Sequence, residues 1–345
     1  MKNEESTQDT ERLLRQLSDL EGKRIVVWGD LVADHTVYGD TSRISREAPV
    51  LILEKEWDTV SAGCAGNAVM NVAALGGIPV PVGILGKDEM GRRLTQEFAS
   101  RGIDTTHVLG KSEVQTAIKM RVLAGGLHTV KQQVIRIDSA GGYRNVLDSE
   151  IETRLRQALR DADGVIVSDY SLGTVRPSVF ARLVRKRSLL SVIDSRHNLL
   201  DFREAVSATP NEPELEEVSR VAFGDDEALL DKAARTTQRR LLLEALLVTR
   251  GKRGMALYQP RRPRIDIPVD QVREIVDVTG AGDTVIAAYT LALAAGSTFE
   301  EAAALANVAA GLAVMERGAA APSAGEVRRV VSGRAAGRRV VGEGC

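Results

Sequence analysis

The chain has 345 residues, of which 43% are hydrophobic and 27% are charged, which is ordinary for a globular protein. This length predicts two domains, or one large α/β domain with an appendage. Lys and Arg (46) balance Asp and Glu (47), and aromatic residues make up only 3%. The balance argues against a protein that binds nucleic acid through its backbone or by base stacking, but leaves room for a local basic pocket that binds a phosphorylated small molecule.

Two cysteines, Cys64 and Cys345, cannot build a disulfide framework, and the four histidines show no spacing typical of zinc sites. We therefore expect a cytoplasmic protein in a reducing environment. The polar, acidic N-terminus lacks the basic start and the apolar run of a signal peptide. The apolar stretches at 284–295 and 302–315 are shorter than the roughly 18–20 residues that cross a bilayer, so we predict no membrane segment.

Leucines at helical spacing predict a helical arm over residues 1–22, interpreted as a surface arm without chemistry. Beyond it, short apolar runs alternate with helical periodicity, which predicts a doubly wound, mostly parallel sheet with helices on both faces over 23–330. The predicted strands are 25–27, 80–84, 164–167, 190–193 and 246–248; the predicted helices are 65–76, 90–102, 149–161, 177–187, 227–242, 283–295 and 299–316. The Gly- and Arg-rich tail at 331–345 is expected to be disordered.

Two segments break this alternation. Residues 35–60 and 115–138 carry strand-like runs, at 50–55, 116–122 and 129–137, without intervening helices. They predict antiparallel ribbons that form a small sheet over one edge of the core. Because open α/β sheets bind ligands at the carboxyl ends of their strands, we interpret this sheet as a lid, with structural edge strands as the alternative.

The segment DVTGAGD, residues 277–283, leads from a loop into an apolar helix. Gly280, Ala281 and Gly282 allow close approach of an anion to the free N–H groups of the first helical turn. An acidic residue in that turn would repel a phosphate unless it handles a proton, so Asp283 is a candidate general base for phosphoryl transfer to a hydroxyl. The alternative is a plain glycine turn with an aspartate cap. The segment matches neither a Walker A loop nor a dinucleotide fingerprint.

The same segment resembles the C-terminal signature of ribokinase-like (PfkB) carbohydrate kinases. Three more elements of that family follow in its order: AGCAGNAVMN at 62–71, TPNEPE at 209–214 and VTRG at 248–251. The resemblance implies a ribokinase-like fold and an ATP-dependent kinase that uses Mg²⁺ and, in some members, K⁺.

Within the family, the chain most resembles the heptose 7-phosphate kinases, through residues 27–34, 38–50, 119–123, 132–138 and 168–170. This likeness implies phosphorylation of the anomeric hydroxyl of D-glycero-D-manno-heptose 7-phosphate, a step toward ADP-heptose and the lipopolysaccharide core. In many bacteria that kinase is fused to a nucleotidyltransferase. Since 345 residues leave little room for a second domain, we expect a stand-alone kinase.

The family pattern implies a role for each matching position. Asp283 would be the base, and the backbone of 280–282 the anion hole. The residues implied to hold the sugar are Asp30, Asp34, Gly63 and Asn67. Asn211 and Glu214 would organise Mg²⁺-bound phosphates, and Thr249, Gly251 and Asn307 would line the nucleotide pocket. Asp277 and Thr279 resemble a monovalent-cation loop.

Each of these positions also has an ordinary structural interpretation. Asp30 and Asn67 can cap a turn and a helix, and Asn211 with Glu214 can form a solvated loop. Asn307 can be a buried amide with satisfied hydrogen bonds, and Thr279 can end a strand.

A sugar phosphate needs cations. Candidates in the lid or on its rim are Arg43, Lys119, Arg121 and Arg136, and Arg196 follows a core strand. The alternative is that the lid cations are outward residues of an exposed ribbon.

The chain departs from the heptose kinase pattern at three places: Cys64 replaces a second glycine, Leu172 replaces a lysine, and Ser195-Arg196 replaces Pro-Lys. Two other functions therefore stay open. One is a PfkB-type kinase for ribose, a fructose phosphate or a nucleoside, and the other is a catalytically silent ligand-binding protein. A homodimer through the lid sheet is plausible by resemblance.

Overall fold

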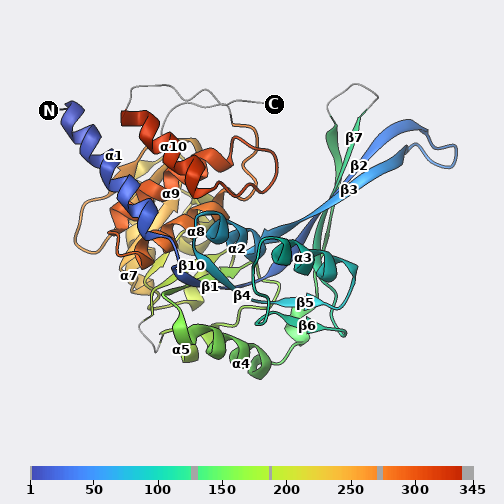
Figure 1. Ribbon diagram of the computed structural model, residues 1–345, viewed down its shortest axis with the longest axis horizontal. Helices are drawn as coiled ribbons and strands as arrows, with labels where there is room; N and C mark the ends of the chain where they lie inside the picture. The colour runs from blue at the N-terminus through green and yellow to red at the C-terminus, as the bar shows by residue number, and fades with distance from the viewer. Residues whose placement is uncertain (1, 126–130, 186–188, 270–274, 336–345) are drawn as a thin grey trace.

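The computed structural model describes residues 2–125, 131–185, 189–269 and 275–335 (Figure 1). The helices are α1 (Lys2–Asp19), α2 (Ala65–Ala74), α3 (Glu89–Ser100), α4 (Asp148–Ala158), α5 (Pro177–Leu183), α6 (Glu212–Ser219), α7 (Glu227–Leu241), α8 (Ala281–Ala294), α9 (Phe299–Ala313) and α10 (Ala324–Ala335). The strands are β1 (Arg24–Gly29), β2 (Leu31–Ile44), β3 (Leu51–Cys64), β4 (Ile78–Val82), β5 (Ile84–Gly86), β6 (Leu109–Lys111), β7 (Ala117–Gly125), β8 (Gln132–Ser139), β9 (Gly164–Asp169), β10 (Ser191–Ser195), β11 (Ser207–Ala208), β12 (Ala245–Thr249), β13 (Met255–Tyr258) and β14 (Ile265–Ile267).

An eight-stranded sheet in the order β14-β13-β12-β11-β10-β9-β1-β4 forms the centre of the molecule. The strands from β12 through β4 pair in parallel, whereas β13 and β14 add an antiparallel edge. The chain runs from β1 to β4 on one side and later returns to β9 on the other. This reversal makes the carboxyl ends of β1 and β9 the topological switch point, where open α/β sheets bind their ligands.

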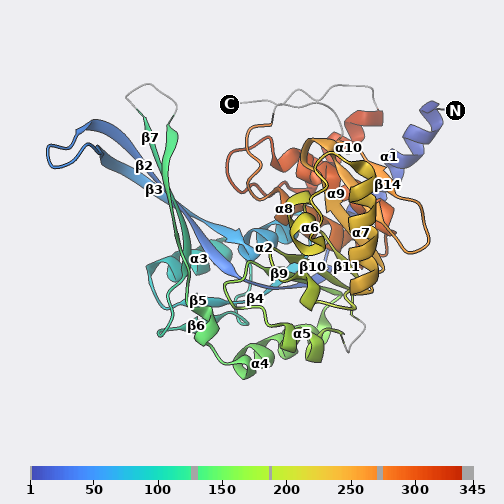
Figure 2. The ribbon, with the colours of Figure 1, turned by 180° about the vertical axis from the view of Figure 1, so that it is seen from behind.

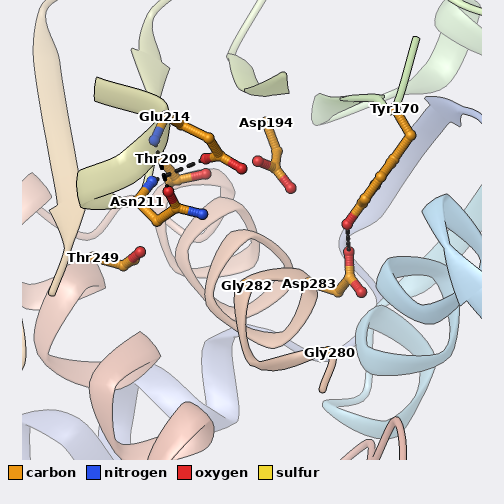
Figure 3. Close-up of a pocket in the computed structure, with 9 residues that line it drawn as sticks. All are labelled: Tyr170, Asp194, Thr209, Asn211, Glu214, Thr249, Gly280, Gly282 and Asp283. Atoms are coloured by element: carbon orange, nitrogen blue, oxygen red, sulfur yellow. Dashed lines mark hydrogen bonds between the residues drawn. The ribbon is translucent and has the colours of Figure 1, made fainter. Parts of the chain in front are cut away.

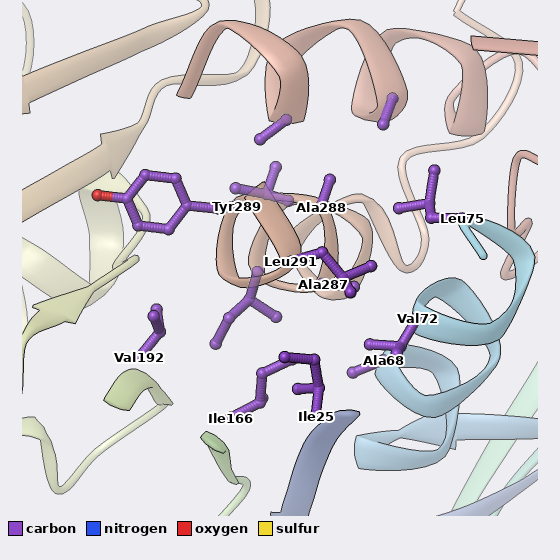
Figure 4. Packing of buried hydrophobic residues seen from close by; sticks show 14 of the residues in the cluster. Ile25, Ala68, Val72, Leu75, Ile166, Val192, Ala287, Ala288, Tyr289 and Leu291 are labelled. Atoms are coloured by element: carbon purple, nitrogen blue, oxygen red, sulfur yellow. The ribbon is translucent and has the colours of Figure 1, made fainter. Parts of the chain in front are cut away.

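Two apolar layers cover the sheet, as its uninterrupted apolar strands predict. Alternate residues of β1 face opposite layers: Ile25 lies under α2, α8 and α9, and Val26 faces the layer of α4, α5 and α7. Figure 4 shows Ile25, Ile166 and Val192 packed beneath α8. Helix α8 is buried on nearly every side. Many of its side chains are alanine, and their small size lets the sheet and the neighbouring helices approach it closely.

The predicted lid is a four-stranded sheet in the order β3-β2-β7-β8. It projects from the core as a twisted ribbon (Figures 1 and 2). A single residue separates β1 from β2, and β3 ends immediately before the first residue of α2, so the lid is joined directly to core elements at both ends. The lid is thus longer than predicted from 35–60, because the mostly apolar residues 31–34 and 61–64 continue the ladder down into the core.

Other differences from the prediction lie at the two ends of the chain. The arm at 1–22 forms α1, but its Leu13, Leu17 and Leu20 are buried in the core, so this helix is a part of the core's cover and not a free surface arm. Helix α10 extends to Ala335, five residues into the tail predicted to be disordered, because Val327 and Val331 bury an apolar side. The rest of that tail, and the start of the strand predicted at 129–137, lie outside the described residues.

Candidate active site

A pocket of about 180 Å³ opens where the carboxyl ends of β9 to β12 face the N-terminus of α8 (Figure 3). Each of these four strands delivers a side chain at or next to its carboxyl end, which is where open α/β sheets bind their ligands. The lining residues are Tyr170, Asp194, Thr209, Asn211, Glu214, Thr249, Gly280, Gly282 and Asp283.

Asp283 lies in the first turn of α8 and is buried, with only 5% of its surface exposed. Its Oδ2 accepts a hydrogen bond from Asn67 Nδ2 at 2.9 Å, and its Oδ1 accepts one from the hydroxyl of Tyr170 at 3.1 Å. Burial raises the pKa of Asp283 to about 6, although the two hydrogen bonds and the charge of Lys119 act in the opposite direction. A carboxylate with a pKa near neutrality is suited to accept a proton from an alcohol.

The two glycines before Asp283 are needed for different reasons. Gly280 begins the helix with φ +78°, and a Cβ there would clash with Asn67 Nδ2. A Cβ on Gly282 would instead point into open space in the pocket. Among the residues that the structure describes, no side chain caps this helix end, so the N–H groups of Gly282 and Asp283 are available to an anion. Ala281 is the first helical residue; its N–H bonds to Val278 O.

Acidic side chains line the opposite wall. Burial, and then the charges of Glu214 and Asp283, hold the pKa of Asp194 well above its ordinary value. Burial also raises the pKa of Glu214. Asn211 and Glu214 form a capping box at the start of α6: Glu214 N–H donates to Asn211 Oδ1 at 2.8 Å, and Asn211 N–H donates to Glu214 Oε2 at 3.0 Å. These two residues are therefore both a helix cap and a part of the pocket wall.

This wall fits a hydrated magnesium ion. The buried carboxylates of Asp194 and Glu214 repel each other, and a divalent cation between phosphates and these oxygens would neutralise them. Within the described residues, no group of three or more His, Cys, Asp or Glu side chains could hold a metal ion. Magnesium is commonly held by one or two carboxylates with waters and phosphates completing its shell, so the donor set is sufficient.

A second pocket of about 310 Å³ adjoins the first and shares Tyr170, Asn211 and Glu214 with it. Its other lining residues are Arg196, His197, Pro213 and Glu217. The exposed Arg196 thus lies beside the acidic wall. Its positive charge offsets a part of the rise that burial causes in the pKa of Glu214.

The lid residues closest to Asp283 contact one another. Arg121 pairs with Asp34 at 2.8 Å, and a Cβ on Gly63 would come within 2.5 Å of Asp34 Oδ2, so glycine there leaves room for that carboxylate. Lys119 Nζ donates to Cys64 Sγ at 2.8 Å, and burial raises the pKa of this thiol. Cys64 has a left-handed φ of +54°, which glycine adopts without strain.

Asp30, which was predicted to hold the sugar, lies inside the core. Its carboxylate is fully buried and accepts hydrogen bonds from the N–H groups of Tyr170, Leu172 and Thr174 at 2.9–3.0 Å. Because this carboxylate is fully buried and already accepts three backbone N–H groups, a sugar hydroxyl cannot reach it. The prediction that Asp30 holds the sugar is therefore wrong in this structure: Asp30 anchors the loop that follows β9.

Three other predicted residues lie away from the pockets. Arg43 is exposed near the outer end of β2, nine residues beyond Asp34 and so about 30 Å along the strand. Asn307 donates to Pro268 O, and Gly251 is exposed; neither lines the pockets. The long strand β2, the turn after β12 and helix α9 carry these three residues past the pockets, which motif order alone does not reveal.

The remaining predicted residues lie near the site but have other partners. Arg136 forms a bidentate pair with Asp138 on β8. The carboxylate of Asp277 accepts the N–H groups of Thr279 and Gly318 and so ties the loop before α8 to the loop after α9. These hydrogen bonds, which outweigh the effect of burial, lower the pKa of Asp277.

The sequence prediction missed the roles of Tyr170, Asp194 and Thr209. All three directly follow or end an apolar strand of the parallel sheet. A systematic search for polar residues at strand ends would have found them.

Known proteins resemble this chain in sequence and in structure. Residues 23–324 match the pfkB family of carbohydrate kinases. The chain belongs to this family. It is 38% identical over 318 residues to the bifunctional protein HldE of Hahella chejuensis, an alignment covering 92% of this chain and 65% of that protein. It is also 38% identical to HldE of Methylococcus capsulatus, covering 94% and 67%. This pfkB kinase thus spans about two thirds of the length of these relatives.

Solved structures share the fold of this chain. Arabidopsis thaliana ribokinase, in complex with ribose and ATP, superposes with a TM-score of 0.72 at 21% identity, covering 90% of this chain and 99% of that one. Escherichia coli phosphofructokinase-2 in complex with potassium gives 0.72 at 18% identity, covering 91% and 99%.

These similarities confirm two predictions: that the fold is ribokinase-like, and that the protein is an ATP-dependent carbohydrate kinase. No helix in the described part of the chain is long and apolar enough to cross a membrane.

Proposed function

We propose that this pfkB kinase transfers the γ-phosphoryl group of ATP to the anomeric hydroxyl of D-glycero-D-manno-heptose 7-phosphate, in the cytoplasm, on the route to ADP-heptose and the lipopolysaccharide core. The observation that carries the transfer is the buried carboxylate of Asp283 at an uncapped helix N-terminus that opens into a polar pocket. Identities of 37–38% to HldE proteins, over more than nine-tenths of the chain, support the heptose phosphate.

In this mechanism Asp283 accepts the proton of the acceptor hydroxyl as its oxygen attacks the γ-phosphorus. The N–H groups of the first turn of α8 stabilise the charge on the transferring group, and Gly282 leaves the space that its oxygens need. Asn211, Glu214 and Asp194 would hold Mg²⁺ through water and phosphate oxygens. When bound, this ion neutralises negative charge on the phosphates. Thr249 and Thr209 line the nucleotide side of the pocket.

The acceptor would lie between Asp283 and the base of the lid. Asp34, Gly63 and Asn67 face this space from β2, β3 and α2, and we assign the sugar hydroxyls to them. Lys119, Arg121, Arg136 and Arg196 supply positive charge around it for the distal phosphate. Binding would require Arg121 and Arg136 to exchange their present carboxylate partners for phosphate oxygens.

Two further assignments belong to this proposal. The loop of Asp277 and Thr279 would hold a monovalent cation such as K⁺. The exposed apolar side chains of the lid would pair two subunits as a homodimer, since such residues seldom gather on a monomer without a partner.

ADP release, measured over a panel of acceptors, tests the substrate. Heptose 7-phosphate should give a kcat/KM at least a hundredfold above ribose, fructose 1- or 6-phosphate and nucleosides. Ribose and nucleosides lack the distal phosphate, and the fructose phosphates carry theirs closer to the anomeric hydroxyl. Robust turnover of a free pentose or a nucleoside without turnover of heptose 7-phosphate would refute the proposal.

A further inference from the structure

The hydroxyl of Tyr170 engages the carboxylate that we propose as the base. It donates to Asp283 Oδ1 at 3.1 Å (Figure 3). Asn67 donates to the other oxygen, Oδ2. A base that removes a proton from an alcohol must first accept a hydrogen bond from that alcohol. The phenol is itself an O–H donor. It therefore makes the contact with Asp283 that an acceptor hydroxyl has to make.

The ring of Tyr170 also separates the two sides of the site. It lines both pockets at the strand ends, and Lys119 Nζ from the lid lies over the ring, 4.8 Å from its centroid. Neither pocket is lined by Asp34, Asn67 or Lys119. The ring thus stands between the nucleotide side and the lid residues that we assign to the acceptor.

The backbone that carries Tyr170 is held firmly. Asp30 accepts the N–H groups of Tyr170, Leu172 and Thr174, as described above. Asp169 accepts the N–H of Ser171 at 2.9 Å. Because the loop is anchored from both sides, the phenol can leave Asp283 most easily by rotation of its own side chain, without rearrangement of the loop.

We propose that Tyr170 is a gate which seals Asp283 while the acceptor is absent and thereby keeps water from the γ-phosphoryl group. Without the gate, a water on Oδ1 would form its O–P bond as the bond from the γ-phosphorus to the bridging oxygen of ADP breaks. Its proton would go to Asp283, and the products would be ADP and phosphate. The bound acceptor opens the gate: its sugar ring takes the place of the phenol, and its hydroxyl then bonds to Oδ1. This inference rests on the assignment of Asp283 as base.

The test measures phosphate release from MgATP alone, with no sugar present. Tyr170→Phe keeps the ring but removes the hydroxyl, leaving room for a water on Oδ1, and should raise hydrolysis about five- to twentyfold. Tyr289→Phe is the matched control: this buried tyrosine of α8 bonds to Ser207, away from Asp283, and its loss should leave hydrolysis unchanged. Adding Asp283→Asn to Tyr170→Phe should return hydrolysis to the background rate.

Hydrolysis that is unchanged or reduced in a folded Tyr170→Phe enzyme would overturn the gate and leave the phenol only a role in orienting Asp283. If this variant does not fold, the wild-type enzyme gives the answer with the 1,5-anhydro analogue of heptose 7-phosphate, which lacks the transferable hydroxyl. This analogue should displace the phenol, admit water and stimulate hydrolysis; no stimulation by an analogue that binds contradicts the gate.

A failure of the proposed function looks different. An Asp283→Asn enzyme that still phosphorylates its acceptor refutes the base itself. Loss of transfer in Asp283→Asn, combined with no rise in hydrolysis in Tyr170→Phe, refutes only the gate.

Discussion

At the scale of single residues, the site depends on the protonation state of Asp283. Burial opposes its carboxylate form, whereas the donors Asn67 and Tyr170 favour it, and the outcome is a pKa of about 6. The sequence predicted this residue because few other reasons place a carboxylate in a glycine-rich anion-binding turn. It could not predict that Asn67, 216 residues away, would hold the same carboxylate, because only the packing of α2 against α8 brings the two together.

The first prediction is a pH dependence. The base works only when deprotonated, so kcat/KM should rise with pH through about 6 and fall about tenfold per pH unit well below it. Asn67→Ala removes a hydrogen-bond donor that stabilises the carboxylate of Asp283, so the rise of kcat/KM should move to higher pH. A profile that is flat between pH 5 and 8 in steady-state assays would exclude Asp283 as the titrating base.

The second prediction concerns Asp30, whose motif position suggested sugar binding. Asp30→Asn offers an N–H group to backbone donors in a buried site, so it should lower the free energy of unfolding by about 2–4 kcal/mol and speed hydrogen exchange over 170–174. Asp34→Asn, at a carboxylate that faces the lid, should mainly raise the KM of the acceptor. The opposite pattern would restore the sugar-binding role of Asp30.

At the scale of elements, most of the fold followed from apolar periodicity, since strands of a covered parallel sheet and amphipathic helices carry strong patterns. Helix α6 was missed although Asn211 and Glu214 have the spacing of a capping box, because the same residues were interpreted as a phosphate site. Strands β13 and β14 were missed because they are short and follow a turn with no helix between them. The long β2 and β3 mix polar and apolar residues, so their full length became clear only from their pairing.

The third prediction compares the two glycines at the start of α8. Gly280→Ala has to place a Cβ against Asn67 at a left-handed φ, and should destabilise the fold by about 1–3 kcal/mol. Gly282→Ala fits a regular helix and should not lower stability, but its methyl group enters the pocket and should weaken ATP binding at least fivefold. Thermal unfolding and ATP titration of the two variants check this; equal effects on both quantities would contradict it.

At the scale of the whole molecule, the lid presents apolar side chains to solvent. Ile135 and Ile137 on β8 are each 50% exposed, and Trp57 on β3 is 48% exposed. The outer lid is therefore a poor surface for a monomer in water. Because β2 and β3 join the core directly beside Asp34 and Cys64, pairing of two lids would also fix the acceptor side of each site.

The fourth prediction follows from that exposure. Sedimentation analysis should find a dimer for the wild-type protein and a monomer for the double variant Ile135→Asp, Ile137→Asp, because two buried charges oppose pairing. Leu147→Asp, at a leucine outside the lid that is even more exposed, should remain a dimer. A wild-type monomer at micromolar concentration, or a dimer that tolerates both lid charges, would refute pairing through the lid.

The most direct test of the central claim is the single substitution Asp283→Asn, measured for both phosphoryl transfer and ATP binding. The side chain keeps its size but can no longer accept a proton, so kcat should fall about a hundred- to ten-thousandfold while the Kd for MgATP stays within about threefold of wild type. A turnover rate that survives this substitution would contradict the account of the site.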